Sequence, residues 1–197
     1  MKLGVLASHG GTTLQAILDA ISSGQLLAEV AILVSNNSRS GAMERALNHG
    51  LPTAHISGAT HPDDDNRDKA IRNALQQCEV DLVVLSGYMK PLGSATLAAF
   101  DGRIINTHPS LLPKFGGAGF YGIHVHEAVL AAGESTTGAS VHLVRGEYDT
   151  GPVIAQCELP VLAADTALSL QERVKSAEQS LLIDVLKRWA QGQIGNR

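Results

Sequence analysis

An asparagine and a histidine stand on either side of Thr107, where an apolar run ends. Residues two apart in an extended segment point to the same face, so we expect the Asn106 amide and the His108 imidazole to lie side by side. Amide N–H donors and a protonated imidazole suit the negative oxygen of an acyl-transfer intermediate. In the plainer alternative, Asn106 caps a turn and His108 stacks on Pro109. The strand before the pair and the prolines after it favour the functional interpretation.

Asp149 is a candidate charge partner for this pair. It lies between two apolar runs, followed by Thr150, Gly151 and Pro152. Because these are ordinary turn residues, the segment alone carries little information. If the turn folds over His108, the carboxylate is expected to raise the imidazole pKa from about 6.5 and keep the ring charged near neutral pH.

A second candidate site is the glycine-rich turn around Gly11, Thr12 and Thr13, which joins an apolar strand to a periodic helix. A helix N-terminus offers unpaired N–H groups and the positive end of the helix dipole, which suit a phosphate. The turn is not GxGxxG and lacks the Walker lysine, which disfavours NAD and ATP. A tight turn in which Thr12 is the N-cap fits the same residues equally well.

Two histidines near a helix start, His124 and His126, allow a metal hypothesis together with His108 or His142. No paired cysteines and no further His/Glu motif accompany them. A histidine at a helix start is more often structural, so we predict no metal site.

Lys175 and Glu178 lie three residues apart and therefore share one face of the last helix. A weak surface ion pair is the simpler interpretation. Contact of both side chains with a ligand's phosphate and hydroxyl groups is the alternative.

Apolar runs and helical periodicity alternate along the first half of the chain. Strands are expected at residues 3–7, 30–34, 53–56, 81–85 and 103–106, with helices at 14–21, 42–48, 65–77 and 93–100. This alternation predicts an α/β fold: a Rossmann-like, doubly wound, mostly parallel sheet. Ligands bind at the carboxyl ends of such strands, and Asn106 and His108 stand at one of them.

The second half is expected to add antiparallel strands to the same sheet. A helix is predicted at 125–132, strands at 139–144 and 153–158, and then a long C-terminal helix. The apolar stripe of that helix is predicted to be Leu170, Val174, Ala177, Leu181, Val185 and Leu186. No linker-like composition and no repeat is visible. We therefore expect a single domain over 1–197, with halves at 1–110 and 111–197.

Composition narrows the class of protein. The net charge is −4 and there is no basic block, which argues against a nucleic-acid partner. Two cysteines without metal spacing favour a reduced, cytoplasmic setting. No stretch approaches the roughly 20 apolar residues of a membrane span, so no membrane partner is expected. Small-molecule substrates remain, and the oligomeric state is left open.

Three motifs resemble those of the folate-dependent formyltransferases, and the resemblance extends from residue 3 to about 186. Residues 106–113, Asn-Thr-His-Pro-Ser-Leu-Leu-Pro, resemble the signature of that group. Residues 149–154, Asp-Thr-Gly-Pro-Val-Ile, resemble its aspartate loop. The Gly-Thr-Thr-Leu-Gln-Ala turn at 11–16 is similar to the branch that acts on phosphoribosylglycinamide.

The resemblance implies an enzyme of purine biosynthesis, which moves a formyl group from 10-formyltetrahydrofolate to the glycinamide amine without a metal. His108 would donate a proton and stabilise the oxyanion, Asn106 would hold the formyl oxygen, and Asp149 would raise the basicity of His108. The implied contacts of the phosphoribosyl substrate are Gly11, Thr12, Thr13, Lys175 and Glu178. The implied folate contacts are Met89, Lys90, Pro91, Leu92, Asn106, Arg145, Gly146, Glu147, Tyr148 and Asp149.

The sequence departs from the family pattern in three places. The phosphate turn usually reads Gly-x-Gly-Ser-Asn, so Thr13 must replace an asparagine here. The loop at 115–122, with four glycines, is longer than the commonest form. It is expected to act as a lid over the glycinamide site. The segment at 61–67 also differs, and no folate contact is assigned to Arg67.

Other functions fit the residues less well. A formyltetrahydrofolate deformylase would carry an N-terminal regulatory domain, and a methionyl-tRNA formyltransferase a basic C-terminal one. Sugar-nucleotide formyltransferases also tend to be longer. A non-catalytic folate or phosphoribosyl-ligand binding protein would not require Asn106, His108 and Asp149 together.

Overall fold

A computed structural model describes residues 1–195 of the protein, and its strands and helices alternate as expected. The chain forms two compact units, one made of residues 1–105 and 187–195, the other of residues 106–186. The elements are β1 (Lys2–Ala7), α1 (Thr12–Ser22), β2 (Glu29–Ser35), α2 (Gly41–Asn48), β3 (Thr53–His55), α3 (Asp64–Gln77), β4 (Leu82–Leu85), α4 (Ser94–Ala99), β5 (Ile104–His108), α5 (Ile123–Ala131), β6 (Thr136–Leu143), β7 (Val153–Pro160) and α6 (Ala167–Ala190).

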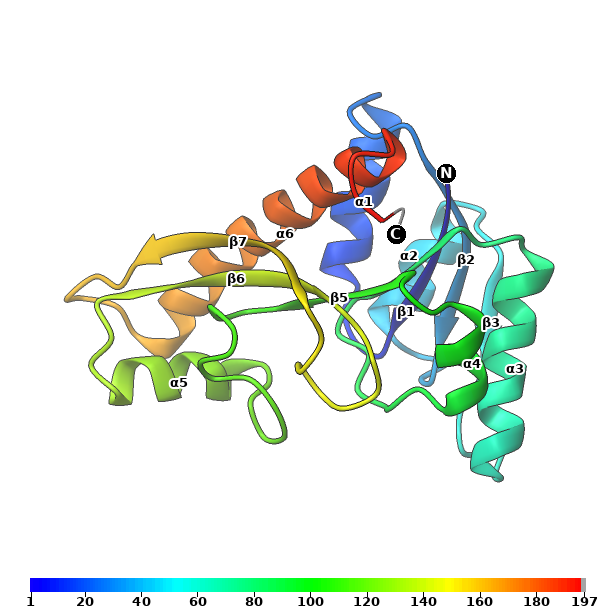
Figure 1. The fold of residues 1–197 in the computed structure, drawn as a ribbon, viewed down its shortest axis with the longest axis horizontal. Coiled ribbons are helices and arrows are strands. Elements are labelled where there is room, and N and C mark those ends of the chain that lie inside the picture. The colour runs from blue at the N-terminus through cyan, green and yellow to red at the C-terminus, as the bar shows by residue number, and fades with distance from the viewer. Residues whose placement is uncertain (196–197) are drawn as a thin grey trace. The chain divides into compact units, whose positions relative to one another are not determined.

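The strands are hydrogen-bonded in the order β3-β2-β1-β4-β5-β6-β7 (Figure 1). In the first unit, β1 pairs in parallel with β2 and β4, and β2 pairs in parallel with β3. In the second unit, β6 and β7 pair antiparallel. The predicted fold class, an α/β protein with a mostly parallel sheet and an antiparallel C-terminal pair, is confirmed. All four residues of β4 are buried, as in strands that are covered on both faces.

The turn before α1 depends on Gly11. Its φ of 70° lies in the left-handed region, and a Cβ there would meet the Cα of Ala42 at 2.6 Å. Gly11 is the N-cap of α1 and no side chain caps the helix, so the alternative in which Thr12 is the N-cap is wrong. The N–H groups of the first helical turn consequently have no acceptor within the helix.

A buried carboxylate on α3 fixes the segment that follows β4. Asp68, which is 7% exposed, accepts hydrogen bonds from the backbone N–H groups of Gly93, Ala95 and Thr96 at 3.0, 2.8 and 3.1 Å. It thereby caps α4 from a neighbouring helix, and α3 and α4 lie side by side in Figure 1. Ser8 holds the other end of the same loop, because its hydroxyl accepts the N–H of Met89 at 2.9 Å.

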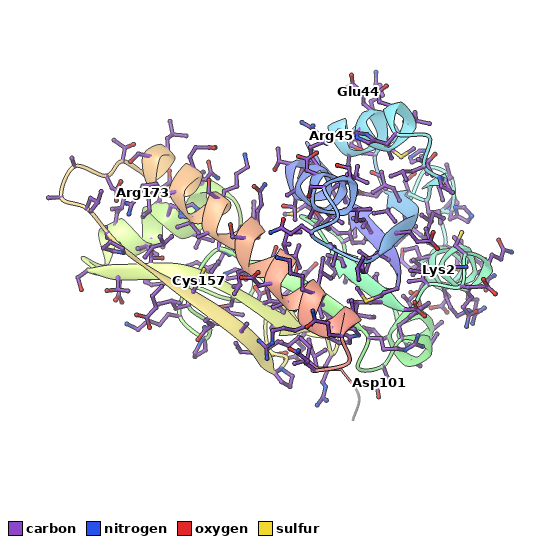
Figure 2. All side chains as sticks on the ribbon, turned by 90° about the horizontal axis from the view of Figure 1, so that it is seen from above. Lys2, Glu44, Arg45, Asp101, Cys157 and Arg173 are labelled. Carbon is purple, nitrogen blue, oxygen red and sulfur yellow. The ribbon has the colours of Figure 1, made fainter. Side chains whose placement is uncertain are left out.

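The second unit is built around a small core that draws on two helices and a strand. Val129 of α5, Ala139 of β6 and two residues of α6, Leu170 and Val174, form one buried cluster. Cys157 of β7 packs against this cluster, and Figure 2 shows it near α6. Arg173 of α6 donates to the carbonyl of Pro160 at 2.8 Å, which ties the helix to the end of β7.

Two details of the sequence prediction change. Strand β5 continues two residues beyond its predicted end at Asn106, so His108 also lies within the strand. The buried stripe of α6 includes Leu182 and Ile183, which were not predicted, whereas Ala177 and Leu181 are only half-buried. Leu170, Val174, Val185 and Leu186 are buried as predicted.

Replacing Asp68 by alanine is expected to lower the free energy of unfolding by about 3 kcal/mol, because three buried N–H groups lose a charged acceptor. Urea unfolding measures the change. Asp65→Ala, an exposed aspartate on the same helix, serves as the control and should have little effect. Equal losses in the two variants would contradict the capping role of Asp68.

Candidate active site

Successive side chains of β5 point to opposite faces of the strand, so its polar side chains divide between two faces. Asn106 and His108 point to one face of the strand, and Thr107 points to the other. The Thr107 hydroxyl donates a hydrogen bond to the Glu178 carboxylate of α6. The Asn106 and His108 side chains instead reach the loop that follows β6. The pair predicted from the sequence is therefore brought together by the local strand geometry.

The Asp149 carboxylate lies between two histidines in the second unit. Its Oδ2 is 3.3 Å from His108 Nδ1, and its Oδ1 is 3.3 Å from His142 Nε2. The N–H of Gly117 donates to Oδ2 at 3.0 Å, and Asn106 Nδ2 donates to Oδ1 at 3.4 Å. The side chain is only 9% exposed. The turn does fold over His108, as the sequence hypothesis required.

Asp149 itself has φ = 57°, in the left-handed region. Aspartate tolerates this conformation better than most residues other than glycine. Two residues later, a Cβ on Gly151 would meet the carbonyl oxygen of Leu143 at 1.8 Å. The tight return of the chain onto the end of β6 therefore requires a glycine, and this return carries the carboxylate to the histidines.

His142 of β6 belongs to the site, although the sequence suggested only a metal role for it. Its Nδ1 faces the Leu143 carbonyl at 2.9 Å, so Nδ1 carries a proton. Its Nε2 lies 3.2 Å from Asn106 Nδ2 and 3.3 Å from Asp149 Oδ1. The signal available in the sequence was a histidine between Val141 and Leu143 of a predicted strand, where a buried polar group needs a partner. His142 thereby contacts both the Asn106 amide and the Asp149 carboxylate.

The His108 ring is fixed at both nitrogens. Nε2 lies 2.7 Å from the carbonyl oxygen of Phe115, and because a carbonyl only accepts, Nε2 must carry a proton. Nδ1 faces Asp149, and the longer 3.3 Å separation there indicates a looser contact. The Phe115 carbonyl thus sets the tautomer and the ring orientation, as an orienting group does for a catalytic histidine. Nδ1 is the nitrogen that faces the polar group formed with Asn106.

The charges in this cluster differ from the sequence hypothesis. Burial lowers the pKa of His108 below 6.5, and the opposing effects of Asp149 and the Phe115 carbonyl do not overcome it. The expectation that Asp149 keeps His108 charged near neutral pH is therefore wrong, because desolvation outweighs the attraction. For Asp149, burial raises the pKa, but contacts with His142, His108 and the Gly117 N–H outweigh burial and hold the pKa below 3.8.

Lys175 and Glu178 do not form the surface ion pair of the simpler interpretation. Lys175 Nζ lies 3.6 Å from Glu172, one turn earlier, and Glu178 is bound by Thr107. Burial raises the pKa of Glu178, against the opposing effects of the Thr107 hydrogen bond and of Lys175. The two side chains are half-buried. They remain candidate ligand contacts on the face of β5 that carries Thr107.

The remaining predicted residues lie in loops. In the second unit, Arg145, Gly146, Glu147 and Tyr148 are exposed and lead into Asp149. In the first unit, Met89, Lys90 and Pro91 are exposed, whereas Leu92 is buried, in the loop after β4. Gly11, Thr12 and Thr13 form the start of α1. The ligand contacts of these three segments stay predictions.

The long loop at 115–122 packs on itself. The rings of Phe115 and Phe120 meet edge to face with centroids 6.1 Å apart. Its backbone supplies both the Phe115 carbonyl that accepts from His108 and the Gly117 N–H that donates to Asp149. The loop therefore contributes main-chain groups to the site, which its sequence did not reveal.

The two histidines considered for a metal site differ in their exposure to solvent. His124 is exposed and lies 3.0 Å from Glu127, whereas His126 is 1% exposed. Within residues 1–195, no group of three His, Cys, Asp or Glu side chains has the arrangement of a metal site. Over the same residues, no helix is both long enough and apolar enough to span a membrane.

The fold and the site together define an α/β protein with an amide, two imidazoles and a carboxylate side by side, and comparison with known proteins identifies its family. A family model described as formyl transferase matches residues 1–186. The chain therefore belongs to the formyl transferase family.

Individual relatives carry more specific names. The chain is 39% identical to a chloroplastic phosphoribosylglycinamide formyltransferase of Vigna unguiculata, over 98% of this chain and 62% of the relative. It is 42% identical to a phosphoribosylglycinamide formyltransferase of Mycobacterium tuberculosis, over 92% and 81% of the two chains. The structure of glycinamide ribonucleotide transformylase 1 from Symbiobacterium toebii matches with a TM-score of 0.90 and 36% identity, over 98% and 88%. The chain thus spans less than two thirds of the plant relative's length.

Buried His126 is expected to lower the stability of the folded protein at acidic pH. Burial, and secondarily the nearby His108, lower the pKa of His126 below 6.5, and its buried Nδ1 has no hydrogen-bond partner among the described residues. Below about pH 6.5 the unfolded chain binds a proton that the folded chain resists, so stability is lost as the pH falls.

His126→Leu is therefore expected to reduce the difference in unfolding free energy between about pH 7.5 and 5.5. Denaturant titrations at the two pH values measure it. His124→Leu changes an exposed histidine of the same helix and should keep the wild-type difference. An unchanged pH dependence in His126→Leu would show that the buried ring does not resist protonation.

Proposed function

We propose that this protein transfers the formyl group of 10-formyltetrahydrofolate to the amine of phosphoribosylglycinamide, a step of purine biosynthesis. The observation that carries the proposal is the buried group of Asn106, His108 and Asp149, joined by contacts of 3.3–3.4 Å. An amide, an imidazole and a carboxylate suit the charges of acyl transfer to an amine. Membership in the formyl transferase family and the names of its relatives support the same reaction.

In the proposed reaction the amine nitrogen attacks the formyl carbon, which gives a tetrahedral intermediate with a negative oxygen. The Asn106 N–H, whose 3.4 Å contact with Asp149 is long, turns to this oxygen. Nδ1 of His108 takes the proton that the attacking amine loses, while Nε2 stays on the Phe115 carbonyl, and the imidazolium formed stabilises the negative oxygen. The intermediate then collapses: the bond from the formyl carbon to the folate nitrogen breaks, and His108 donates its Nδ1 proton to that nitrogen.

Asp149 acts through charge in this mechanism. The negative oxygen raises the affinity of the His108 ring for a proton, and Asp149 stabilises the imidazolium that forms at Nδ1. Because the pKa of His108 is lowered in the free protein, the protonated ring is a stronger acid than an exposed histidine. Asp149 is also proposed to relay protons through water between the amine and the folate nitrogen.

Binding of the two substrates is assigned by resemblance. The uncapped first turn of α1 at Gly11, Thr12 and Thr13 is proposed to hold the phosphate, since its N–H groups lack acceptors within the helix. Lys175 and Glu178 are proposed to contact the phosphate and the ribose hydroxyls. The loops at 89–92 and 145–149 are proposed to contact the folate. We also propose a cytoplasmic location, from the composition and the two free cysteines.

The alternative reaction, hydrolysis of formyltetrahydrofolate, would use the same polar group with water in place of the amine. An absorbance assay for tetrahydrofolate distinguishes the two. Product is expected only when phosphoribosylglycinamide is present, and product formed without it would identify a deformylase. His108→Ala, expected to lower kcat by at least about a hundredfold, shows that the activity comes from this site. A folded His108→Ala variant with near wild-type kcat would overturn the mechanism.

Asp149→Asn tests the role of the carboxylate. We expect kcat to fall on the order of a hundredfold, with a much smaller change in folate affinity, because the charge acts on the transition state. The negative charge of Asp149 raises the pKa of His108, so its removal should shift the limb of the pH–rate profile that reports His108 to lower pH. Steady-state kinetics across pH measure both effects. Weaker folate binding with unchanged kcat would assign Asp149 to binding alone.

A further inference from the structure

We propose that Gln156 of β7 is a positioning residue for His108, acting through a hydrogen-bonded clamp on the chain that leaves β5. This inference rests on the proposed function of His108. Gln156 touches neither His108 nor Asp149, and no sequence motif singles it out. Its side-chain amide is the outermost member of a network that ends at the Phe115 carbonyl.

The clamp holds both backbone groups of one residue. Gln156 Nε2 donates to the carbonyl oxygen of Leu112 at 3.0 Å and to the hydroxyl of Ser140 at 2.8 Å. That hydroxyl accepts the N–H of Leu112 at 3.0 Å and donates to the carbonyl of Ser110 at 2.6 Å. Both protons of the Gln156 amide and every bonding position of the Ser140 hydroxyl are therefore used.

The buried serines carry the clamp toward the site. Ser110 and Ser140 are fully buried, so neither has water as an alternative partner. Ser110 Oγ donates to the carbonyl of Lys114 at 2.6 Å, which fixes the residue before Phe115. The Phe115 carbonyl in turn accepts from His108 Nε2 at 2.7 Å. A displacement of Leu112 consequently moves the acceptor that orients the imidazole.

Gln156 is suited to a test because of where it lies. Its position on β7 is exposed, and only the amide end reaches the clamp, so substitution leaves the buried core in place. Leucine keeps a similar stem but cannot donate. Glutamate keeps the shape and places an oxygen against the Leu112 carbonyl. Glu158, two residues along the same face of β7 and exposed, offers the control Glu158→Leu.

The readout is the protonation of His108 itself. The Phe115 carbonyl favours the charged ring, as does Asp149 from the loop after β6, whereas His142 on β6 disfavours it. His126 of α5 is also coupled to His108 by charge. If the clamp holds the Phe115 carbonyl on Nε2, loosening the clamp removes one contribution that favours the imidazolium. The midpoint of the His108 titration then moves to lower pH.

The experiment follows His108 by long-range 1H–15N correlation spectra of histidine-labelled protein across pH, with steady-state kinetics on the same samples. In Gln156→Leu, which changes no charge, we expect a lower midpoint for His108, and in both Gln156 variants a kcat reduced on the order of tenfold, with both KM values within about twofold. Glu158→Leu should match the wild type.

An unchanged His108 midpoint in folded Gln156→Leu would overturn the proposal, even if its stability falls, because a purely structural role predicts that result. A raised KM for the folate with unchanged kcat would also overturn it. The titration needs no substrate, so it tests the clamp even if the wild-type protein proves to be a deformylase. Failure of the proposed function is seen separately, in the wild-type assay.

Discussion

The arrangement of the second unit depends on one buried carboxylate placed between two imidazoles. Asp149 lies 3.3 Å from both His108 and His142 and is 9% exposed. A charge at this depth is costly without partners. The contacts of Asp149 with both histidines and with the Gly117 N–H hold its pKa below the ordinary value despite burial. Stability and proposed chemistry are therefore coupled at this residue.

The elements around Asp149 and the two histidines supply hydrogen-bond partners to these side chains. The chain returns tightly at Gly151, where any Cβ would collide with the Leu143 carbonyl. The glycine loop supplies a main-chain N–H to Asp149 and, at Phe115, a carbonyl to His108. Every substitution keeps a main-chain carbonyl, and every substitution except proline keeps a main-chain N–H, which makes these groups dependable orienting partners. In the proposed clamp, Gln156 of β7 and Ser140 of β6 likewise hold main-chain groups, those of Leu112.

Burial and neighbouring groups change the pKa of His108 in opposite directions, and their balance determines when the ring binds a proton. Burial lowers the pKa of the ring, and Asp149 and Phe115 only partly restore it. The free protein therefore holds a histidine that resists protonation until negative charge develops beside it. A group poised in this way suits a reaction in which an oxygen becomes negative only in the transition state. A histidine held permanently charged would stabilise the unreacted state as well.

Much of this protein could be predicted from its sequence, because the deciding features are local. Periodicity gave the alternation of strands and helices, and the side-chain alternation of a strand placed Asn106 beside His108. Motif resemblance selected Asp149 from among ordinary turn residues. The tertiary structure alone decided three things: the balance of burial against charge at His108, the entry of His142 into the site, and the contacts of the glycine loop. These depend on desolvation and on main-chain positions set by residues far apart in the sequence, and neither is encoded in the spacing of residue types.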